Sequence, residues 1–155
     1  MTNAPLPNPC PTRKRFHHTP PPAIDTTAAF FFITICAETR GGTPFVDAAA
    51  VLLDAARFYH ERGKWFVRLF LVMPDHLHAI LHVPPGMGLA ETIRSWKRYL
   101  AKAHGIRFQE DFFDTRLRDA EHFQEKWNYI RNNPVAKGLV ATPDDWLHQF
   151  SYSIR

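Results

Sequence analysis

The chain has 155 residues, of which 45% are hydrophobic and 22% charged, the size and balance of one globular domain. Nineteen lysines and arginines against fifteen acidic residues give a net charge of +4. This charge favours an anionic binding partner, and nucleic acid is the first candidate. The longest apolar stretch, residues 28–37, is too short to cross a bilayer, so a membrane-spanning protein is excluded. Cys10 and Cys36 form no CxxC pair, which fits a reducing compartment, and we expect a cytoplasmic protein.

The first 23 residues differ in composition from the rest of the chain. Seven of the thirteen prolines fall within them, and because proline lacks a backbone donor we predict an extended arm over residues 1–23. Arg13, Lys14 and Arg15 make this arm basic and suited to phosphate contacts, although a terminus with chance basic residues explains them equally well. A single domain then covers residues 24–155.

The first half of this domain contains three predicted strands and one helix. An aromatic and β-branched run predicts a strand over residues 30–36, and helical spacing of alanine and leucine predicts a helix over 47–62. Residues 66–72 and 76–83 are predicted to form two antiparallel strands joined by a turn at 73–75.

A second helix is predicted over residues 89–103, where apolar side chains recur at helical spacing. The opposite side of this helix is basic. It either contacts DNA or is simply solvated, and its cationic residues are Arg94, Lys97, Arg98 and Lys102.

The remaining elements complete an α+β fold. Residues 108–117 favour a fourth strand, and residues 119–133 a third helix that Pro134 is expected to end. The tail after Gly138 is weakly patterned. The order β-α-β-β-α-β followed by a helix predicts a ferredoxin-like antiparallel sheet, with helices on one face and an additional C-terminal helix.

Two histidines in the third strand are candidate metal ligands. His76 and His78 are at i and i+2, so their imidazoles lie on one face of the strand and can converge on one cation. Leu77, Ala79 and Leu81 then face the covering helices. Two histidines do not make a complete metal site, and alone they are equally explained as paired histidines of an edge strand.

The third predicted helix offers the missing groups. Tyr129 and Asn133 are one turn apart on the same side, so an amide oxygen for Mg²⁺ or Mn²⁺ lies next to a nucleophilic hydroxyl. Without the histidine pair, an ordinary surface tyrosine and a helix-capping asparagine explain these residues as well.

Taken together, the two motifs resemble a known family. Val72-Met73-Pro74-Asp75-His76-Leu77-His78, followed some fifty residues later by Tyr129-Ile130-Arg131-Asn132-Asn133-Pro134-Val135-Ala136-Lys137-Gly138-Leu139-Val140, is similar to the REP-associated tyrosine transposases of the single-tyrosine HUH superfamily. The resemblance runs from about Arg13 to Val140. Residues 135–140 correspond to the sequence VRAGLV that is usual in the family, but here the positive charge lies one place later, on Lys137. The Pro-x-Ser-Ser sequence that is usual near the C-terminus is absent.

The resemblance implies a role for each motif residue. His76, His78 and Asn133 would bind Mg²⁺ or Mn²⁺, and Tyr129 would be the nucleophile. Arg118 lies in a segment leading into the tyrosine helix, for which we expect a role in positioning DNA. His82, on the same strand face as His78, is a candidate proton acceptor or a surface histidine.

The implied activity is cleavage and rejoining of single-stranded DNA that folds into repeat hairpins, through a 5′-phosphotyrosine intermediate. The binding partner would be single-stranded or hairpin DNA, and we expect no binding to a membrane. The oligomeric state would be either a monomer or a homodimer in which the tyrosine helix is exchanged between the two chains. Two other functions fit the same residues. One is a non-catalytic nucleic-acid-binding module that stacks bases on its sheet, and the other is a metallonuclease that uses water.

Overall fold

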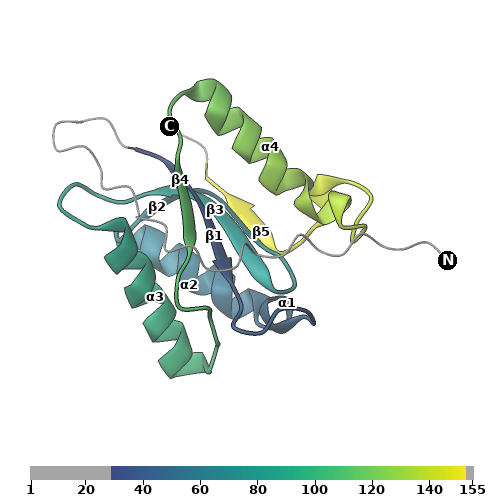
Figure 1. The fold of residues 1–155 in the computed structure, drawn as a ribbon, viewed down its shortest axis with the longest axis horizontal. Helices are drawn as coiled ribbons and strands as arrows, with labels where there is room; N and C mark the ends of the chain where they lie inside the picture. The colour runs from purple at the N-terminus through teal and green to yellow at the C-terminus, as the bar shows by residue number, and fades with distance from the viewer. Residues whose placement is uncertain (1–28, 153–155) are drawn as a thin grey trace.

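A five-stranded antiparallel sheet forms the centre of the protein in the computed structural model, which describes residues 29–152 (Figure 1). The strand order is β4-β1-β3-β2-β5. The first four strands therefore have the order predicted for the ferredoxin-like arrangement, and β5 extends the sheet beyond it. The strands are β1 (Phe31–Cys36), β2 (Phe66–Val72), β3 (His76–His82), β4 (Phe113–Arg116) and β5 (Gln149–Ser151).

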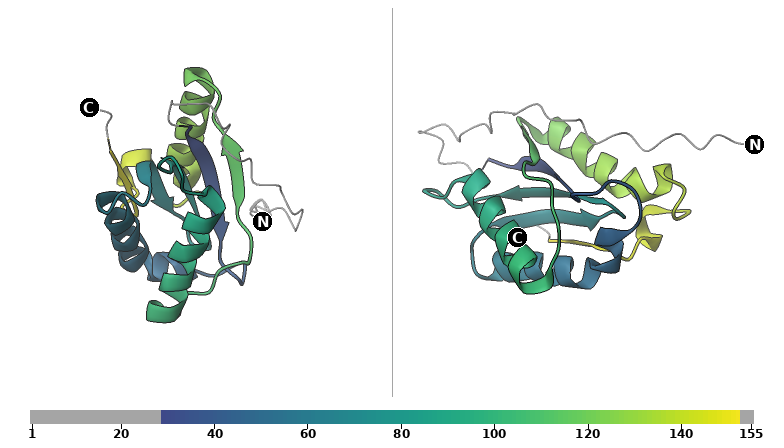
Figure 2. Two further views of the ribbon diagram at one scale, coloured as in Figure 1. Left: turned by 90° about the vertical axis from the view of Figure 1, so that its left-hand side faces the viewer. Right: turned by 60° about the horizontal axis from the view of Figure 1, so that its bottom comes forward.

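The helices lie on both faces of the sheet. The right-hand view of Figure 2 shows α4 (Ala120–Ala136) on one side and α1 (Pro44–Asp47), α2 (Ala49–Glu61) and α3 (Leu89–His104) on the other. The α+β class is confirmed, with α4 as the additional helix. Within residues 29–152, no helix combines the length and apolar character needed to cross a membrane.

Alternation along β3 decides which residues meet which helices. Leu77, Ala79 and Leu81 belong to the core beneath α2 and α3, whereas Ile80 belongs to a smaller core with Ile130 of α4. Successive strand residues point to opposite faces, so the even-numbered residues of β3 share the α4 face. The predicted division of β3 is confirmed, and it directs His76 and His78 toward α4.

The C-terminal end of α4 differs from its prediction. Pro134 does not end the helix, which continues to Ala136. Proline costs this helix one backbone hydrogen bond, which the N–H of another residue at position 134 would donate to the carbonyl of Ile130, and the helix nevertheless continues for two more residues. The chain instead leaves the helix at Gly138, whose φ of 72° is a conformation that glycine adopts readily.

Two other elements are shorter than expected. The helix predicted over 47–62 begins at Ala49, because a separate turn of helix, α1, precedes it. The strand predicted over 108–117 pairs regularly with β1 only over Phe113–Arg116, with an isolated bridge between Ala37 and Phe108.

The weakly patterned tail forms an edge strand. The 3₁₀ turn η1 (Pro143–Asp145) leads to β5, which pairs with β2. Arg131 of α4 holds this segment in place by donating to the side chains of Gln149 and Asp144. The tail therefore connects α4 to the edge of the sheet.

Candidate metal and tyrosine site

Strand β3 brings His76 and His78 together. Their ring centres are 4.8 Å apart, and His78 is only 4% exposed because α4 and β1 cover it. His78 also stacks on Phe32 of β1, with ring centres 5.4 Å apart. The pair lies inside the protein, so paired edge-strand histidines no longer explain it.

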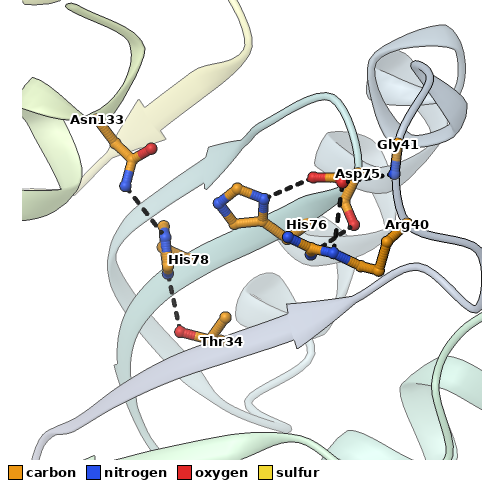
Figure 3. A network of polar contacts seen from close by, with 7 residues as sticks. All are labelled: Thr34, Arg40, Gly41, Asp75, His76, His78 and Asn133. Atoms are coloured by element: carbon orange, nitrogen blue, oxygen red, sulfur yellow. Dashed lines mark hydrogen bonds and ion pairs between the residues drawn. The ribbon is translucent and has the colours of Figure 1, made fainter. Parts of the chain in front are cut away.

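Each imidazole is oriented through its Nδ1 atom (Figure 3). His78 Nδ1 forms a 2.9 Å hydrogen bond with Thr34 Oγ1, and His76 Nδ1 a 2.9 Å hydrogen bond with Asp75 Oδ1. A hydroxyl or carboxylate at Nδ1 is the arrangement that commonly fixes metal-binding histidines, since it leaves Nε2 for the metal.

Asp75 is itself held as a carboxylate. The hydrogen bond from His76 lowers its pKa to about 2 against the opposing effect of burial, with further lowering from the Gly41 N–H and the charge of Arg40. Gly41 N donates to Oδ2 at 2.9 Å, and Arg40 Nε lies 3.4 Å from the same oxygen. Asp75 is therefore an acceptor at neutral pH and keeps the proton of His76 on Nδ1.

His78 is held neutral. Burial lowers its pKa well below 6.5, and the nearby charges of His76, Arg40 and Lys126 add to this, opposed only by a hydrogen bond with the backbone of Ile33. A neutral imidazole with a free lone pair is the form that binds metal.

Asn133 completes the arrangement from α4. It is 6% exposed, and its Nδ2 atom donates to His78 Nε2 at 3.3 Å. Its Oδ1 atom is buried and has no hydrogen-bond partner in the structure, a costly state for an amide oxygen. Rotation of the amide group exchanges its oxygen and nitrogen, so the acceptor can also face His78.

This donor set fits a divalent cation. Two imidazoles and an unsatisfied amide oxygen converge, and Mg²⁺ and Mn²⁺ accept oxygen ligands alongside imidazole. Across residues 29–152, no group of three or more His, Cys, Asp and Glu side chains is arranged to hold a metal.

Tyr129 borders the same site. It lies one turn before Asn133 on α4 and is 50% exposed. Its ring meets those of His78 and Phe32 edge-on, at 5.6 and 5.9 Å between centres. Lys126 Nζ lies 5.8 Å from the centre of the Tyr129 ring. An exposed hydroxyl-bearing side chain thus stands beside the histidines, within reach of a substrate.

The predicted basic residues do not gather at this site. Helix α3 covers the opposite face of the sheet, and there Lys97 donates to the backbone carbonyls of Gln109, Glu110 and Asp111. Arg94 pairs with Glu91 on the same helix. Arg98 and Lys102 of α3 are exposed, as is Arg118 beside the start of α4, and DNA contacts of these residues stay a prediction. Arg13, Lys14 and Arg15 lie outside the described residues.

Tyr129 lies beside His78, and His82 is too far from His78 to take a proton from Tyr129. His82 is four positions beyond His78 along the strand, a distance of about 13 Å. Its ring packs instead against Phe30 and Phe66, with centres 5.1 and 4.8 Å apart.

Four residues of the site were not singled out from the sequence. Thr34 lies across the sheet from His78, and Arg40, Asp75 and Lys126 surround the histidines. Asp75 stands within the histidine motif, so its position next to His76 was a usable signal. Thr34, Arg40 and Lys126 are brought to the site only by strand pairing and helix packing.

Comparison with known proteins supports the resemblance. No family model matches the chain. A REP-associated tyrosine transposase of Escherichia coli K12 is 28% identical over 83 residues, which are 52% of this chain and 50% of that protein. The chain thus aligns with about half the length of this curated relative.

Solved structures share the fold. The structure of a REP-associated tyrosine transposase bound to a REP hairpin matches with a TM-score of 0.76, at 20% identity over 88% of this chain and 82% of that chain. A proposed transposase from Deinococcus radiodurans R1 matches with a TM-score of 0.51, at 17% identity over 72% of this chain and 95% of that chain. The chain therefore resembles the REP-associated tyrosine transposases, in sequence over about half its length and in fold over most of it.

Proposed function

We propose that this protein is a metal-dependent nuclease and strand transferase that acts on single-stranded, hairpin-forming repeat DNA. The observation that carries the proposal is the convergence of His76, His78, Asn133 and Tyr129 at one site from β3 and α4. The similarity to transposases, one of them solved with a REP hairpin, supports the choice of DNA as substrate.

The metal ligands in this proposal are His76, His78 and Asn133. Lewis-acid polarisation of the scissile phosphate is the chemistry that bound Mg²⁺ or Mn²⁺ supplies. Thr34 and Asp75 keep the Nε2 atoms of the two histidines directed at the site, and the Asp75 carboxylate lies beside the guanidinium of Arg40.

Tyr129 is the proposed nucleophile. Its hydroxyl oxygen forms a bond to phosphorus, the bond from phosphorus to the 3′-oxygen breaks, and the products are a 5′-phosphotyrosine and a 3′-hydroxyl. The phenol loses a proton and the 3′-oxygen gains one, so protons balance. Because one phosphate ester replaces another, attack by a 3′-hydroxyl reverses the step and joins strands without an energy source.

Lys126 is the cation best placed to bind the phosphate that Tyr129 attacks. Its Nζ lies over Phe32 at 5.1 Å and near Tyr129 at 5.8 Å, and it makes no ion pair with a carboxylate in the described part of the chain. An ammonium group without a counter-charge next to the nucleophile is suited to a non-bridging phosphate oxygen.

The arrangement supports attack within one chain. Tyr129 and His78 of the same chain are in ring contact, so no second copy is required to complete the site. We therefore propose that a monomer cleaves DNA. Mixing Tyr129→Phe with His78→Ala protein should then give no adduct, whereas recovery of activity would mean that the tyrosine helix is exchanged between two chains.

A denaturing gel tests the function. Purified protein, a labelled hairpin with single-stranded flanks and Mn²⁺ should give a slowly migrating covalent adduct, absent with Tyr129→Phe and with His76→Ala. Tyr152→Phe serves as the matched control, since that tyrosine stacks on His60 away from the site. Cut DNA without an adduct, persisting in Tyr129→Phe, would instead support a water-using nuclease. Bound but intact DNA with every protein would support a binding module.

A further inference from the structure

An irregularity in β2 places a charged residue on the α4 face of the sheet. Val67 pairs with Leu81 of β3 and Leu69 pairs with the next residue, Ile80, so Arg68 is an extra residue in a β-bulge. Val67 belongs to the core beneath α2 and α3, whereas Leu69 belongs to the core beneath α4. A bulge redirects the side chains that follow it, and here it turns Arg68 toward α4.

Arg68 is held there without a counter-charge. Its guanidinium lies between two rings, 5.6 Å from the centre of Phe30 and 5.4 Å from that of Phe123 in the first turns of α4. Nε donates to the backbone oxygen of Tyr152 at 3.1 Å, but Nη1 is buried and has no hydrogen-bond partner in the structure. Burial lowers the pKa of Arg68, and among the described residues no carboxylate pairs with it.

Two histidines adjoin this arginine. His60 stacks on Tyr152 with ring centres 4.0 Å apart, and its Nδ1 accepts from the Val67 N–H, which leaves Nε2 for another partner. The pKa of His82 is lowered first by burial and then by repulsion from His60 and Arg68, against a hydrogen bond with Val83. The charge of Glu61 acts on His60 in the opposite direction to burial and raises its pKa. Arg68, His60 and His82 form what we call the distal basic cluster.

Two members of the distal basic cluster, Arg68 and His82, share the α4 face of the sheet with the candidate site, whereas His60 reaches the cluster from the end of α2. His82 and His78 point to the same side of β3, about 13 Å apart along the strand. Phe123, in the early part of α4, borders the cluster, and Tyr129, further along the helix, borders the site.

From this geometry we propose that the distal basic cluster binds a phosphate group of the single strand whose scissile phosphate lies at Tyr129. The inference rests on the proposed function and adds a second contact for the same strand. A guanidinium offers paired donors that match phosphate geometry, and the rings of Phe30 and Phe123 fix its plane before the ligand arrives. Burying a cation without a partner is unfavourable, and an anionic ligand would remove that cost.

The test compares Arg68→Gln with Arg57→Gln, which removes the same charge from an arginine that already lies near the carboxylate of Asp54. Fluorescence anisotropy would measure the affinity of each protein for labelled single strands between about 50 and 200 mM salt. We expect Arg68→Gln to weaken binding by about 10-fold and to reduce the slope of log affinity against log salt by about 0.7, the loss of one single-strand phosphate contact. Arg57→Gln should match the wild type.

A trimmed strand and a measurement with inorganic phosphate complete the test. A strand trimmed so that it reaches Tyr129 but not Arg68 should bind wild type and Arg68→Gln equally, which excludes misfolding as the cause. Equal affinity and equal salt slope of both proteins on the long strand would overturn the inference. Stabilisation of the wild type but not of Arg68→Gln by inorganic phosphate, with unchanged DNA affinity, would overturn it in favour of a site for free phosphate.

The proposed function is judged separately, by the covalent adduct. Affinity and salt slope need no cleavage, so a protein that forms no adduct would overturn the proposed function and still report on the phosphate contact of Arg68.

Discussion

Trp65 and Trp96 are fully buried between the sheet and helices α2 and α3, whereas His78 and Asn133 are buried on the opposite face of the same sheet, beneath α4. The first face is a large apolar core whose side chains fill space. The second has a smaller apolar core around Ile80 and Ile130, and it buries unpartnered atoms of ionisable and amide side chains, whereas the unpartnered atom that we note on the first face is the indole N–H of Trp96.

The difference indicates that the two faces have different roles, one in stability and the other in binding and catalysis. Apolar burial beneath α2 and α3 supplies stability, which lets the α4 face tolerate unsatisfied groups such as Asn133 Oδ1 and Arg68 Nη1. Unsatisfied buried groups are costly and tend to be kept where a ligand satisfies them. Substitutions on the first face should therefore change stability, and those on the second should change binding and catalysis.

The largest expected effect lies on the apolar face. Trp96→Ala removes a fully buried ring that packs against Trp65 and Phe70, and we expect a loss of about 3 kcal/mol in the free energy of unfolding. This is the lower end for such a change, because the buried Trp96 N–H has no partner to lose. Urea denaturation measures the loss. The Mn²⁺ affinity of the folded protein should stay unchanged. A loss of Mn²⁺ affinity together with the loss of stability would argue against separate roles for the two faces.

On the α4 face, His78→Ala should strongly weaken metal binding. Removing one of three proposed ligands should weaken Mn²⁺ binding by more than about 100-fold, since loss of a supporting residue alone commonly costs 10- to 100-fold. His82→Ala is the matched control, from the same face of the same strand. Isothermal titration with Mn²⁺ distinguishes them, and equal affinity of the two variants would contradict the assignment of His78 as a ligand.

A smaller effect is expected at the residue that orients His78. Thr34→Val keeps the shape of the side chain but removes the hydroxyl next to His78 Nδ1. We expect Mn²⁺ affinity to fall by about 10-fold, at the low end for such supporting residues. Thr115→Val changes an exposed threonine on the neighbouring strand and should have no effect. An unchanged affinity in Thr34→Val would mean that packing alone orients the imidazole.

The smallest effect concerns pH and the distal basic cluster. Burial lowers the pKa of His60, His78 and His82 below 6.5, so below neutrality the unfolded chain binds more protons than the folded one. The free energy of unfolding should therefore decrease as the pH falls through 6.5. His82→Gln should make this decrease shallower. Urea denaturation at several pH values measures it, and a decrease as steep as in the wild type would exclude His82 as a contributor.

Local pattern predicted much of the molecule. Strand β2 and the beginnings of β3 and α3 follow from runs of apolar residues and from periodicity, and the strand order followed from the sequence of elements. The side-by-side arrangement of His76 and His78 needed only the two-residue repeat of a strand. These features depend on residues close together in the chain.

Features that depend on distant contacts were not predictable in this way. Strand β5 has three residues and forms because the edge of β2 is open to pairing. The bulge at Arg68 appears only once β2 is aligned with β3. Likewise, Lys97 has the spacing of a surface cation, but the chain at residues 109–111 returns to bind it.

The most direct test of the α4 face is to locate the bond between protein and DNA. After reaction with a hairpin strand in Mn²⁺, trypsin cleavage at Lys126 and Arg131 isolates the peptide Trp127–Arg131, and tandem mass spectrometry locates any attached nucleotide. The account predicts a 5′-phosphonucleotide on Tyr129 of this peptide. Attachment to another residue, or cleaved DNA with this peptide unmodified, would contradict it.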